Sequence, residues 1–589
     1  MPRAKQYLAA HFAFALVFAT GLNLRVAVAQ DVRPAPEAAT EQETKDAAAA
    51  SRHMAAAADP RAAAAARDML RKGGSAIDAA IAAQLVLGLV EPQSSGLGGG
   101  AFIVHWDAVV RQAKTYDARE TAPAAVKPDR FIRDGKRMTF ADAVGSGLSV
   151  GVPGVVRGME LAHRAHGKLP WRTLFEPAIK LAEGGFEVTR RLSQLLSSQG
   201  AESFAPAARA YFFDAVGAAR PPGYTLKNPD YAATLSAIAG GGSAAFYEGR
   251  IAVAIVDAVE AAPIAKGDMT HADISAYVAK EREPLCFTYR VRKICGMGPP
   301  SSGGLAVAQI LKLIEPIEAA TSHSSAMSAP ALHVIAEAEK LAYADRNRYV
   351  ADTDFVPLPD GLLDDIYIAA RRSEINVSRA MPPPSAGTPF TLLKHAYGED
   401  ATVEAAGTSH ISIVDDVGNA VAMTTTIENG FGSRLWAAGF LLNNELTDFS
   451  FDSVDKDGRA IANRPESGKR PRSSMSPTIV IDGDGRVEAV TGSPGGSRII
   501  MYVVKSLVAM LDWRLSPQVA ADLPNFGSEG AAFYIEPSSG SIWPALALKG
   551  YGHAIRAEPM TSGLHTIVRR SGVLLGGADP RREGAALGD

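Results

Sequence analysis

The sequence has few of the residues that bind metals or cross-link chains. Among 589 residues there are 2 cysteines and 12 histidines, and the histidines are scattered without a His-Glu-x-x-His pattern or a Cys/His cluster. Zinc sites in proteins need ligands at such short spacings. We therefore predict neither a catalytic metal nor a cofactor.

An excess of charge of one sign is also missing. The formal net charge is -3, and no long basic run occurs. This balance gives no electrostatic reason to expect binding of nucleic acid or of an anionic membrane. Hydrophobic residues make up 47% and charged residues 21% of the chain, which is typical of a globular protein with enough apolar material for a core.

Long apolar runs are confined to the N-terminus. A basic start precedes an apolar stretch over residues 7–24, and an A-x-A cleavage pattern ends at Ala29. These features indicate a signal peptide over residues 1–29; an uncleaved membrane anchor is the alternative, which Arg25 keeps open. No later segment has the roughly 18 to 20 apolar residues that span a bilayer. We expect a soluble protein, periplasmic or secreted, without membrane attachment once the signal is removed.

The two cysteines lie at the ends of a strand-forming segment. Residues 287–294, between Cys286 and Cys295, are rich in Phe, Thr, Tyr and Val, which favour strands. We predict a tight hairpin whose ends are close enough for a Cys286–Cys295 disulfide. An oxidising compartment favours that bond; two buried thiols are the alternative.

The first half of the chain begins with a polar leader and then becomes helical. Residues 30–50 are rich in Ala, Glu, Pro and Thr and are predicted to be a disordered leader. A helix follows over residues 60–73, because Asp59 can cap it and proline occupies its first position. Ser75, with an acidic residue three positions on, caps a second helix that runs to residue 90 and is apolar on nearly all sides, so it should be buried. Further helices are expected around residues 174–183 and 331–349.

A proline-rich break precedes a change in pattern. Residues 381–387 read MPPPSAG and cannot form regular structure, and polar residues continue to Gly407. From Thr408 the chain is rich in β-branched and alternating residues, so strands are predicted over residues 409–414 and 420–427. Later elements are three strands and one helix, over residues 440–442, 478–481, 487–490 and 499–511.

Thr408 is the most informative residue. A threonine hydroxyl is a poor nucleophile at neutral pH, but cleavage of the peptide bond before it frees an α-amine that can act as its base. An α-amine has a pKa of about 7.7 to 8.0, which is near the working pH of a general base. The polar segment before Thr408 would let the new chain end move away, so we predict self-cleavage at Gly407-Thr408.

Several polar motifs occur in a fixed order around Thr408. They are YDARETAP (116–123), PPSSGG (299–304), TIEN (426–429), NNELTDF (443–449), PRSSMSP (471–477) and TGSPGGS (491–497). Each motif is weak alone, but the ordered set, from about residue 55 to 582, resembles the γ-glutamyltranspeptidase (glutathione hydrolase) family of N-terminal nucleophile hydrolases. The resemblance implies an α+β fold, a four-layer αββα sandwich. It also implies one precursor that cuts itself into a large subunit (51–407) and a small subunit (408–589), which stay together as a heterodimer.

The resemblance assigns catalytic roles to four residues. Thr408 matches the nucleophile, and Thr426 matches the threonine that hydrogen-bonds it. Gly495 and Gly496 match the glycines whose backbone N–H groups form the oxyanion hole. Such a donor can be worth a few kcal/mol in an acyl-transfer enzyme. An ordinary strand residue and a plain glycine turn are the alternative interpretations of Thr426 and the glycine pair.

The resemblance also implies a pocket for a γ-glutamyl group, which carries an α-carboxylate and an α-ammonium. Arg119 matches the family arginine that binds the carboxylate, since a guanidinium can bind it in bidentate fashion. Ser473 and Ser474 match its hydroxyl partners. A surface charge cluster is the alternative for Arg119. Three carboxylates match the positions around the ammonium: Glu428, Glu445 and Asp448. Several members have asparagine where this chain has Glu428, and others have glutamate.

These assignments predict an enzyme that cleaves the γ-glutamyl amide of glutathione and related small molecules through a γ-glutamyl-threonine ester. Water, an amino acid or a peptide would then accept the group. A cephalosporin (glutaryl) acylase of the same fold is the closest alternative, but a glutaryl group lacks the ammonium that the three carboxylates suit. A non-catalytic exported relative is the third possibility.

Three local patterns give weaker evidence about function. Residues 449–472 correspond to the family's lid over the site, but the segment is short and charged and contains no tyrosine. His410 shares a strand face with Thr408, yet a structural role is favoured over that of a general base. The pattern G-x-S-x-G at residues 147–151 is followed by Val-Pro-Gly rather than by the helix that a serine-hydrolase elbow requires, which argues against that class.

Overall fold

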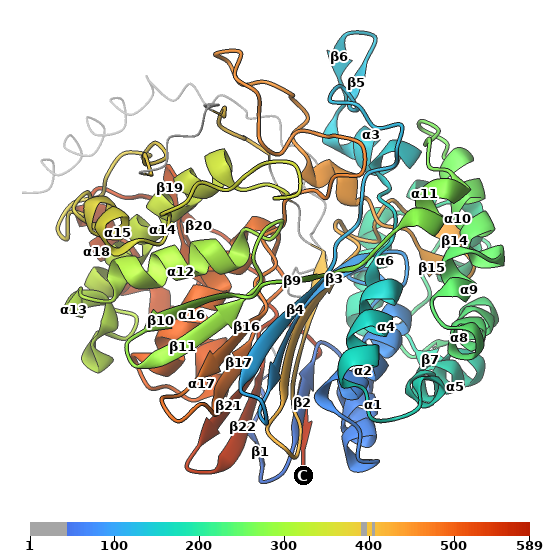
Figure 1. The fold of residues 1–589 in the computed structure, drawn as a ribbon, viewed down its shortest axis with the longest axis horizontal. Coiled ribbons are helices and arrows are strands. Elements are labelled where there is room, and N and C mark those ends of the chain that lie inside the picture. Colours follow the sequence, from blue (N-terminus) through green and yellow to red (C-terminus); the bar gives the residue numbers. More distant parts are fainter. Residues whose placement is uncertain (1–43, 390–396, 403, 405–406) are drawn as a thin grey trace, which may run out of the picture. The chain divides into compact units, whose positions relative to one another are not determined.

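The structure is a computed structural model that describes residues 44–389, 397–402, 404 and 407–589. The predicted signal peptide and most of the predicted leader lie outside the described residues. Two antiparallel sheets of seven strands each occupy the centre, and helices lie to either side of them (Figure 1). The predicted α+β class is confirmed.

The strands of the two sheets come from both sides of Thr408. The first sheet has the order β1-β22-β21-β17-β16-β11-β10, with bounds Ala48–Ala50, Val573–Ala578, His565–Arg570, Val487–Thr491, Thr478–Ile481, Arg292–Gly296 and Leu285–Tyr289. The second has the order β23-β2-β12-β13-β3-β4-β9, with bounds Ala585–Gly588, Met54–Ala57, Thr408–Val414, Ala420–Thr426, Gly100–Asp107, Gln112–Ala118 and Lys280–Arg282. Strand β2 thus lies between two strands that follow Thr408 in the sequence.

Alternation along the strands decides which face each residue occupies. Val104 and Trp106 of β3 pack with Ile479 of β16 and Ile567 of β21 in one hydrophobic cluster, so this cluster lies between the two sheets. Residues of opposite parity, such as Ile103, join a second cluster with the helices beside the second sheet. A third cluster joins the first sheet to the helices on its other side.

Helices cover the outer faces of the two sheets (Figure 1). Beside the second sheet lie α1 (Pro60–Arg71), α2 (Ala76–Val90), α4 (Val155–His166), α5 (Glu176–Gly184), α8 (Pro229–Gly241) and α10 (Arg250–Glu260). Beside the first lie α12 (Gly303–Ile314), α14 (Ala329–Tyr349), α16 (Ile499–Leu511) and α17 (Pro517–Asp522). The remaining α-helices are α3 (Phe140–Val144), α6 (Arg190–Gln199), α7 (Pro206–Phe212), α9 (Ala244–Tyr247), α11 (His271–Ala276), α13 (Glu318–Thr321), α15 (Asp365–Arg372) and α18 (Ile542–Gly550).

Helix α2 is buried along its whole length, as its sequence predicts. Ser75 caps it by accepting from the Asp78 N–H, and one carboxylate oxygen of Asp78 accepts from the Ser75 N–H at 2.8 Å, which completes a capping box. The same oxygen accepts from the N–H groups of Lys168 and Leu169 at 2.9 and 3.0 Å. Asp78 therefore joins the start of α2 to the loop after α4.

The cysteine hairpin is confirmed. Strands β10 and β11 pair with Cys286 directly opposite Cys295, and the two form a disulfide with an S–S distance of 2.06 Å. The predicted helices around residues 174–183 and 331–349 and the strands after Thr408 are also present.

The prediction of disorder is wrong for the last residues of the leader. Ala48–Ala50 form β1, which pairs with β22 at the edge of the first sheet. A strand at an edge is held through main-chain hydrogen bonds, and three alanines give no side-chain alternation from which to predict it. Among the described residues, no helix has both the length and the apolar character required to cross a bilayer.

We expect Asp78→Ala to destabilise the protein by about 2–4 kcal/mol, because it leaves three main-chain N–H groups without their acceptor. Ser75→Ala is the matched control, since it removes one cap and should cost about 1 kcal/mol. Urea unfolding of both variants measures the difference. Equal costs would mean that the contacts with Lys168 and Leu169 add nothing.

Candidate active site

Thr408 is the first residue of β12 and lies opposite Thr426, the last residue of β13. Its side chain hydroxyl is 3.4 Å from that of Thr426, and the residue is 4% exposed. The Thr426 hydroxyl donates to the carbonyl oxygen of Gly407 at 2.6 Å. The predicted nucleophile, its predicted partner and the carbonyl before the predicted cut therefore meet at one point.

The Thr426 hydroxyl is itself held in place. It accepts from the Glu428 N–H at 2.7 Å while donating to Gly407, so its proton is directed at the Gly407 carbonyl. A side chain at position 407 is excluded, because a Cβ there would lie 1.7 Å from the carbonyl oxygen of Glu428. The strand pair thus fixes both the hydroxyl and the peptide group that precedes Thr408.

Gly495 and Gly496 form the turn that leads into helix α16. Their φ angles of 138° and 57° lie in the left-handed region that favours glycine. A Cβ on Gly495 would also lie 2.5 Å from the ring of Tyr502. Gly496 lines the same cavity as Thr408 and opens a short helical turn, Gly496–Arg498, just before α16. Backbone N–H groups at a helix N-terminus favour a negatively charged group nearby.

Arg119 lies among the predicted carboxylates rather than at the surface. It is 1% exposed and forms ion pairs with Glu445 and with Asp448, the latter at 2.5 Å. It also donates to the main-chain carbonyls of Pro471 and Arg472, at 3.2 and 2.8 Å. The surface-cluster alternative for Arg119 is therefore wrong.

The carboxylates outnumber the cations that face them. Burial raises the pKa of Asp448 to about 8, although the Arg119 guanidinium acts in the opposite direction. Burial, together with Asp448 and Glu445, raises the pKa of Glu428 well above its ordinary value. Glu120, which no motif assigned to the site, is also buried with a strongly raised pKa, through burial and then through Glu445. This side of the site would be stabilised by an added cation.

Ser474 is hydrogen-bonded to two charged side chains, Arg346 and Glu404, that sequence patterns did not indicate. The Ser474 hydroxyl accepts from Arg346 Nη2 at 2.6 Å and donates to Glu404 at 2.5 Å. Ser473 instead uses its hydroxyl to accept from the Met475 N–H at 3.1 Å. Arg346 and Glu404 lie far from Ser474 in the sequence, so no local motif could have linked them.

One small cavity brings the predicted residues together. It has a volume of about 20 Å³, and Thr408 and Glu404 both line it. A buried water needs at least about 10–15 Å³ of such space, so little more than a water fits while Glu404 is present. The other predicted residues that line this cavity are Arg119, Thr426, Glu428, Glu445, Asp448, Ser473, Ser474 and Gly496.

Comparison with known proteins agrees with this arrangement. The family model described as Gamma-glutamyltranspeptidase matches residues 62–589. The chain belongs to this family. It is 35% identical to the glutathione hydrolase proenzyme of Bacillus subtilis (strain 168) over 533 residues, which cover 88% of this chain and 89% of that protein.

Acylases are also among the relatives of this gamma-glutamyltranspeptidase family member. The chain is 33% identical to the acylase ACY 1 proenzyme of Pseudomonas sp. (strain V22) over 565 residues, covering 94% of this chain and 96% of the other. Its fold matches the crystal structure of cephalosporin acylase from Bacillus halodurans with a TM-score of 0.80 and 25% identity, covering 93% and 97% of the two chains. The substrate must therefore be argued from the site itself.

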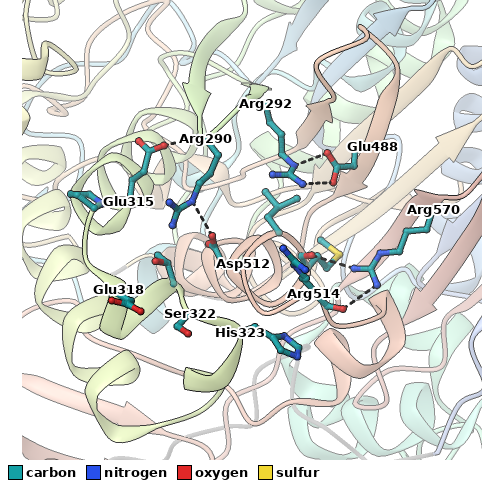
Figure 2. Close-up of a pocket in the computed structure, with 14 residues that line it drawn as sticks. Arg290, Arg292, Glu315, Glu318, Ser322, His323, Glu488, Asp512, Arg514 and Arg570 are labelled. Atoms are coloured by element: carbon teal, nitrogen blue, oxygen red, sulfur yellow. Dashed lines mark hydrogen bonds and ion pairs between the residues drawn. The ribbon is translucent and has the colours of Figure 1, made fainter.

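A larger cavity lies elsewhere and contains none of the predicted residues. It has a volume of about 940 Å³ and is open beside β10, β11 and the end of α16 (Figure 2). Its charges are largely paired with one another: Arg292 with Glu488 at 2.6 Å, and Arg290 with Asp512 at 3.3 Å. Arg570 donates to main-chain carbonyls near the end of α16. These contacts stabilise the helix end and the hairpin.

One group of possible metal ligands occurs in the part of the chain that the structure describes. His333 and Glu337 of α14 lie near His553. The two imidazoles share a hydrogen bond of 2.7 Å, and Glu337 accepts from the Lys340 ammonium at 2.7 Å. This group lines neither cavity described above, and the ammonium opposes a cation at the carboxylate.

The segment expected to cover the site is tied to it by Asn463. The Asn463 amide donates to the carbonyl of Asp448 at 2.8 Å, and its oxygen accepts from the Arg472 N–H at 2.9 Å. Both ends of residues 449–472 are therefore joined by one side chain. The correspondence of this segment to the family's lid stays a prediction.

Two rival catalytic groups have structural contacts instead. The imidazole of His410 is buried between the hydroxyls of Thr424 and Ser412, at 2.9 and 3.0 Å, and burial lowers its pKa to about 3. The Ser149 hydroxyl of the G-x-S-x-G pattern donates to the main-chain carbonyls of Val144 and Ser146. Both observations agree with the roles favoured from the sequence.

We expect His410→Gln to change stability in a pH-dependent way. The folded chain keeps His410 neutral down to about pH 3, whereas the unfolded chain protonates it below about pH 6.5. Stability from this neutral imidazole is therefore present above pH 6.5 and is lost as the pH falls, by about 1.4 kcal/mol per unit. Urea unfolding at pH 7, 6 and 5 should show the gap between wild type and variant closing. A gap independent of pH would contradict the burial argument.

Proposed function

We propose that the protein is a self-processing γ-glutamyl hydrolase and transferase that acts on glutathione and related γ-glutamyl compounds. The observation that carries the proposal is the hydrogen bond from Thr426 to the Gly407 carbonyl, next to the Thr408 hydroxyl, in a cavity rich in carboxylates. Self-cleavage before a threonine is favoured by a polarised peptide carbonyl, and a γ-glutamyl donor, which carries two charges, needs a charged pocket. Both features are supported by these contacts.

The first reaction is the cut. The Thr408 hydroxyl oxygen attacks the carbonyl carbon of Gly407, while the Thr426 hydroxyl stabilises the charge on the carbonyl oxygen. The C–N bond breaks, and the nitrogen of Thr408 takes a proton and becomes the α-amine. Water then hydrolyses the resulting ester, which leaves a carboxylate on Gly407 and restores the Thr408 hydroxyl.

The second reaction is turnover. The Thr408 hydroxyl attacks the γ-amide carbon of the donor, and the new α-amine accepts the hydroxyl proton and passes it to the leaving amine. Backbone N–H groups of Gly495 and Gly496 hold the oxyanion. Water or the amine of an amino acid or peptide then attacks the γ-glutamyl-threonine ester and releases the group.

The choice of a γ-glutamyl over a glutaryl donor rests on charge. Glu445 and Asp448 are buried and share the single guanidinium of Arg119, and Glu428 is buried beside them, where its carboxylate accepts from the Asn444 amide. A buried cluster with more carboxylates than guanidinium groups is costly, so one more cation would stabilise it. The α-ammonium of a γ-glutamyl group supplies it, and a glutaryl group does not. A glutaryl acylase stays the second candidate, because acylases are among the relatives.

The subunit organisation and location belong to the same proposal. Cleavage gives subunits of residues 51–407 and 408–589 that remain a heterodimer within the four-layer αββα sandwich, and the helix and sheet clusters described above support that layering. Export to the periplasm or outside the cell is proposed from the N-terminal pattern. The Cys286–Cys295 disulfide is compatible with an oxidising compartment.

We expect Thr408→Ala to remain one uncut chain without activity, because it lacks the attacking oxygen for both reactions. Thr408→Ser is the control, since it keeps a hydroxyl and should be cut and active at a reduced rate. Gel electrophoresis and hydrolysis of γ-glutamyl-p-nitroanilide measure both properties. A Thr408→Ala protein that is still cut, or still active, contradicts the proposed nucleophile.

We expect Glu428→Gln to reduce the preference for γ-glutamyl-p-nitroanilide over glutaryl-p-nitroanilide by about 10- to 100-fold, because a hydrogen bond between charged groups is worth about 1.5–3 kcal/mol. Glu281→Gln removes an exposed carboxylate that pairs with Lys114 and serves as the control. The ratio of kcat/KM values gives the preference. An unchanged ratio would favour the acylase candidate.

A further inference from the structure

Two buried arginines that no motif indicated lie behind the wall of the cavity. Arg346 is near the end of α14, and Arg472 directly precedes the serine pair; both are at most 3% exposed. Besides Ser474, Arg346 donates to the Ser302 hydroxyl at 2.8 Å, so its guanidinium is fixed in direction. Positive charge is thus concentrated where Ser474 lines the cavity.

The anion that meets this charge is Glu404, four residues before Thr408. One carboxylate oxygen pairs with Arg346 and lies 3.4 Å from Arg472 Nε, and the other accepts from Ser474 at 2.5 Å. Although burial opposes the charged form, Arg346 and Arg472 lower the pKa of Glu404 below its ordinary value. A carboxylate of the chain itself therefore occupies a site built for a carboxylate.

Removal of Glu404 would leave this side of the cavity with excess positive charge. Arg472 also pairs with Asp400 at 3.0 Å, but Arg346 would keep only neutral hydrogen-bond partners within the described part of the chain. Moreover, Nη1 of Arg472 makes no hydrogen bond within the described part of the chain. A buried guanidinium without an anion is costly, so the emptied site would bind an anion.

The two sides of the cavity carry an excess of opposite charges. The side with Glu428, Glu445 and Asp448 has more carboxylates than Arg119 can neutralise, and the side with Ser474 has the two arginines. An amino-acid end, with a carboxylate and an ammonium on one carbon, satisfies both. A ligand with only one of these charges satisfies one side.

We propose that Arg346, Arg472 and Ser474 form the subsite for the α-carboxylate of the γ-glutamyl group, and that Glu404 fills this subsite in the uncut chain. The proposal rests on the proposed function and adds two cations to the predicted contact with Arg119. Glu404 then acts as an internal competitor of the substrate. The uncut chain is closed to donors until the cut frees the segment that carries Glu404.

The test on the cut enzyme uses three p-nitroanilides that differ in charge. The γ-glutamyl compound has both charges, the glutaryl compound has the carboxylate alone, and the 4-aminobutyryl compound has the ammonium alone. Arg346→Gln and Arg472→Gln should each lower kcat/KM for the first two by about 10- to 100-fold and change the third by less than about 3-fold. Equal losses on all three substrates would overturn the subsite.

Arg348→Gln is the matched control for these variants. It removes the same charge from the same helix, but the Arg348 guanidinium lies over the Tyr349 ring, whereas that of Arg346 donates to Ser474. It should leave the three kcat/KM values within about 2-fold of wild type. Arg346→Lys, which keeps the charge but not the planar fork, should recover part of the loss seen with Arg346→Gln.

A second test needs no turnover and covers variants that fail to be cut. In the uncut Thr408→Ala chain, Glu404→Ala deletes the internal carboxylate, and acetate should replace it and raise the unfolding temperature by roughly 1–3 °C over the same ionic strength of chloride. The Thr408→Ala chain with Glu404 intact, and the triple variant with Arg346→Gln, should not respond. No specific response to acetate would overturn the assignment of Glu404.

The two tests separate failure of the subsite from failure of the proposed function. If wild type hydrolyses none of the three compounds, the proposed function is wrong, and the acetate experiment still decides whether Arg346 and Ser474 bind a carboxylate. If wild type is active and the arginine variants discriminate as wild type does, the function stands and the subsite is wrong.

Discussion

The pairing of β12 with β13 is the constraint on which the site depends. It sets Thr408 opposite Thr426, and the Thr426 hydroxyl in turn holds the carbonyl of Gly407. Because both strands are buried on both faces, neither residue can shift without disturbing the packing of two layers. The atoms of the proposed reaction are therefore positioned by rigid strands in the interior of a sheet, whereas the charged groups around them come from loops and helix ends.

Those charged groups would make the proposed reaction selective. A threonine nucleophile alone could attack many amides, but a donor would also have to enter a cavity that is lined by several buried carboxylates and Arg119, with two more buried arginines behind its wall. Each of these groups is stabilised only when its neighbours are in place. The family includes hydrolases and acylases, and the balance of these charges is where its members can differ without any change in the strands.

Much of the fold could be predicted from the sequence, because the sequence patterns that indicate its elements are local. The caps of α1 and α2, the cysteine hairpin, the strand pair after Thr408 and helix α16 follow from patterns within about fifteen residues. The pairing of Arg346, Arg472 and Glu404 could not be predicted, since it joins a helix, a loop and a polar segment that only the folded chain brings together. Strand β1 was missed for a different reason: its alanines carry no alternation, and its register comes from the neighbouring strand.

Both sheets mix strands from before and after Thr408, with β2 held between β12 and β23. A protein cut at Gly407 would therefore consist of two chains that share both sheets, and dilution alone would not dissociate them. Refolding after denaturation is different. Once such a protein is unfolded, contacts that formed within one chain require an encounter of two, whose effective concentration no tether maintains. Recovery of the native state would then depend on protein concentration, whereas refolding of the uncut chain would not.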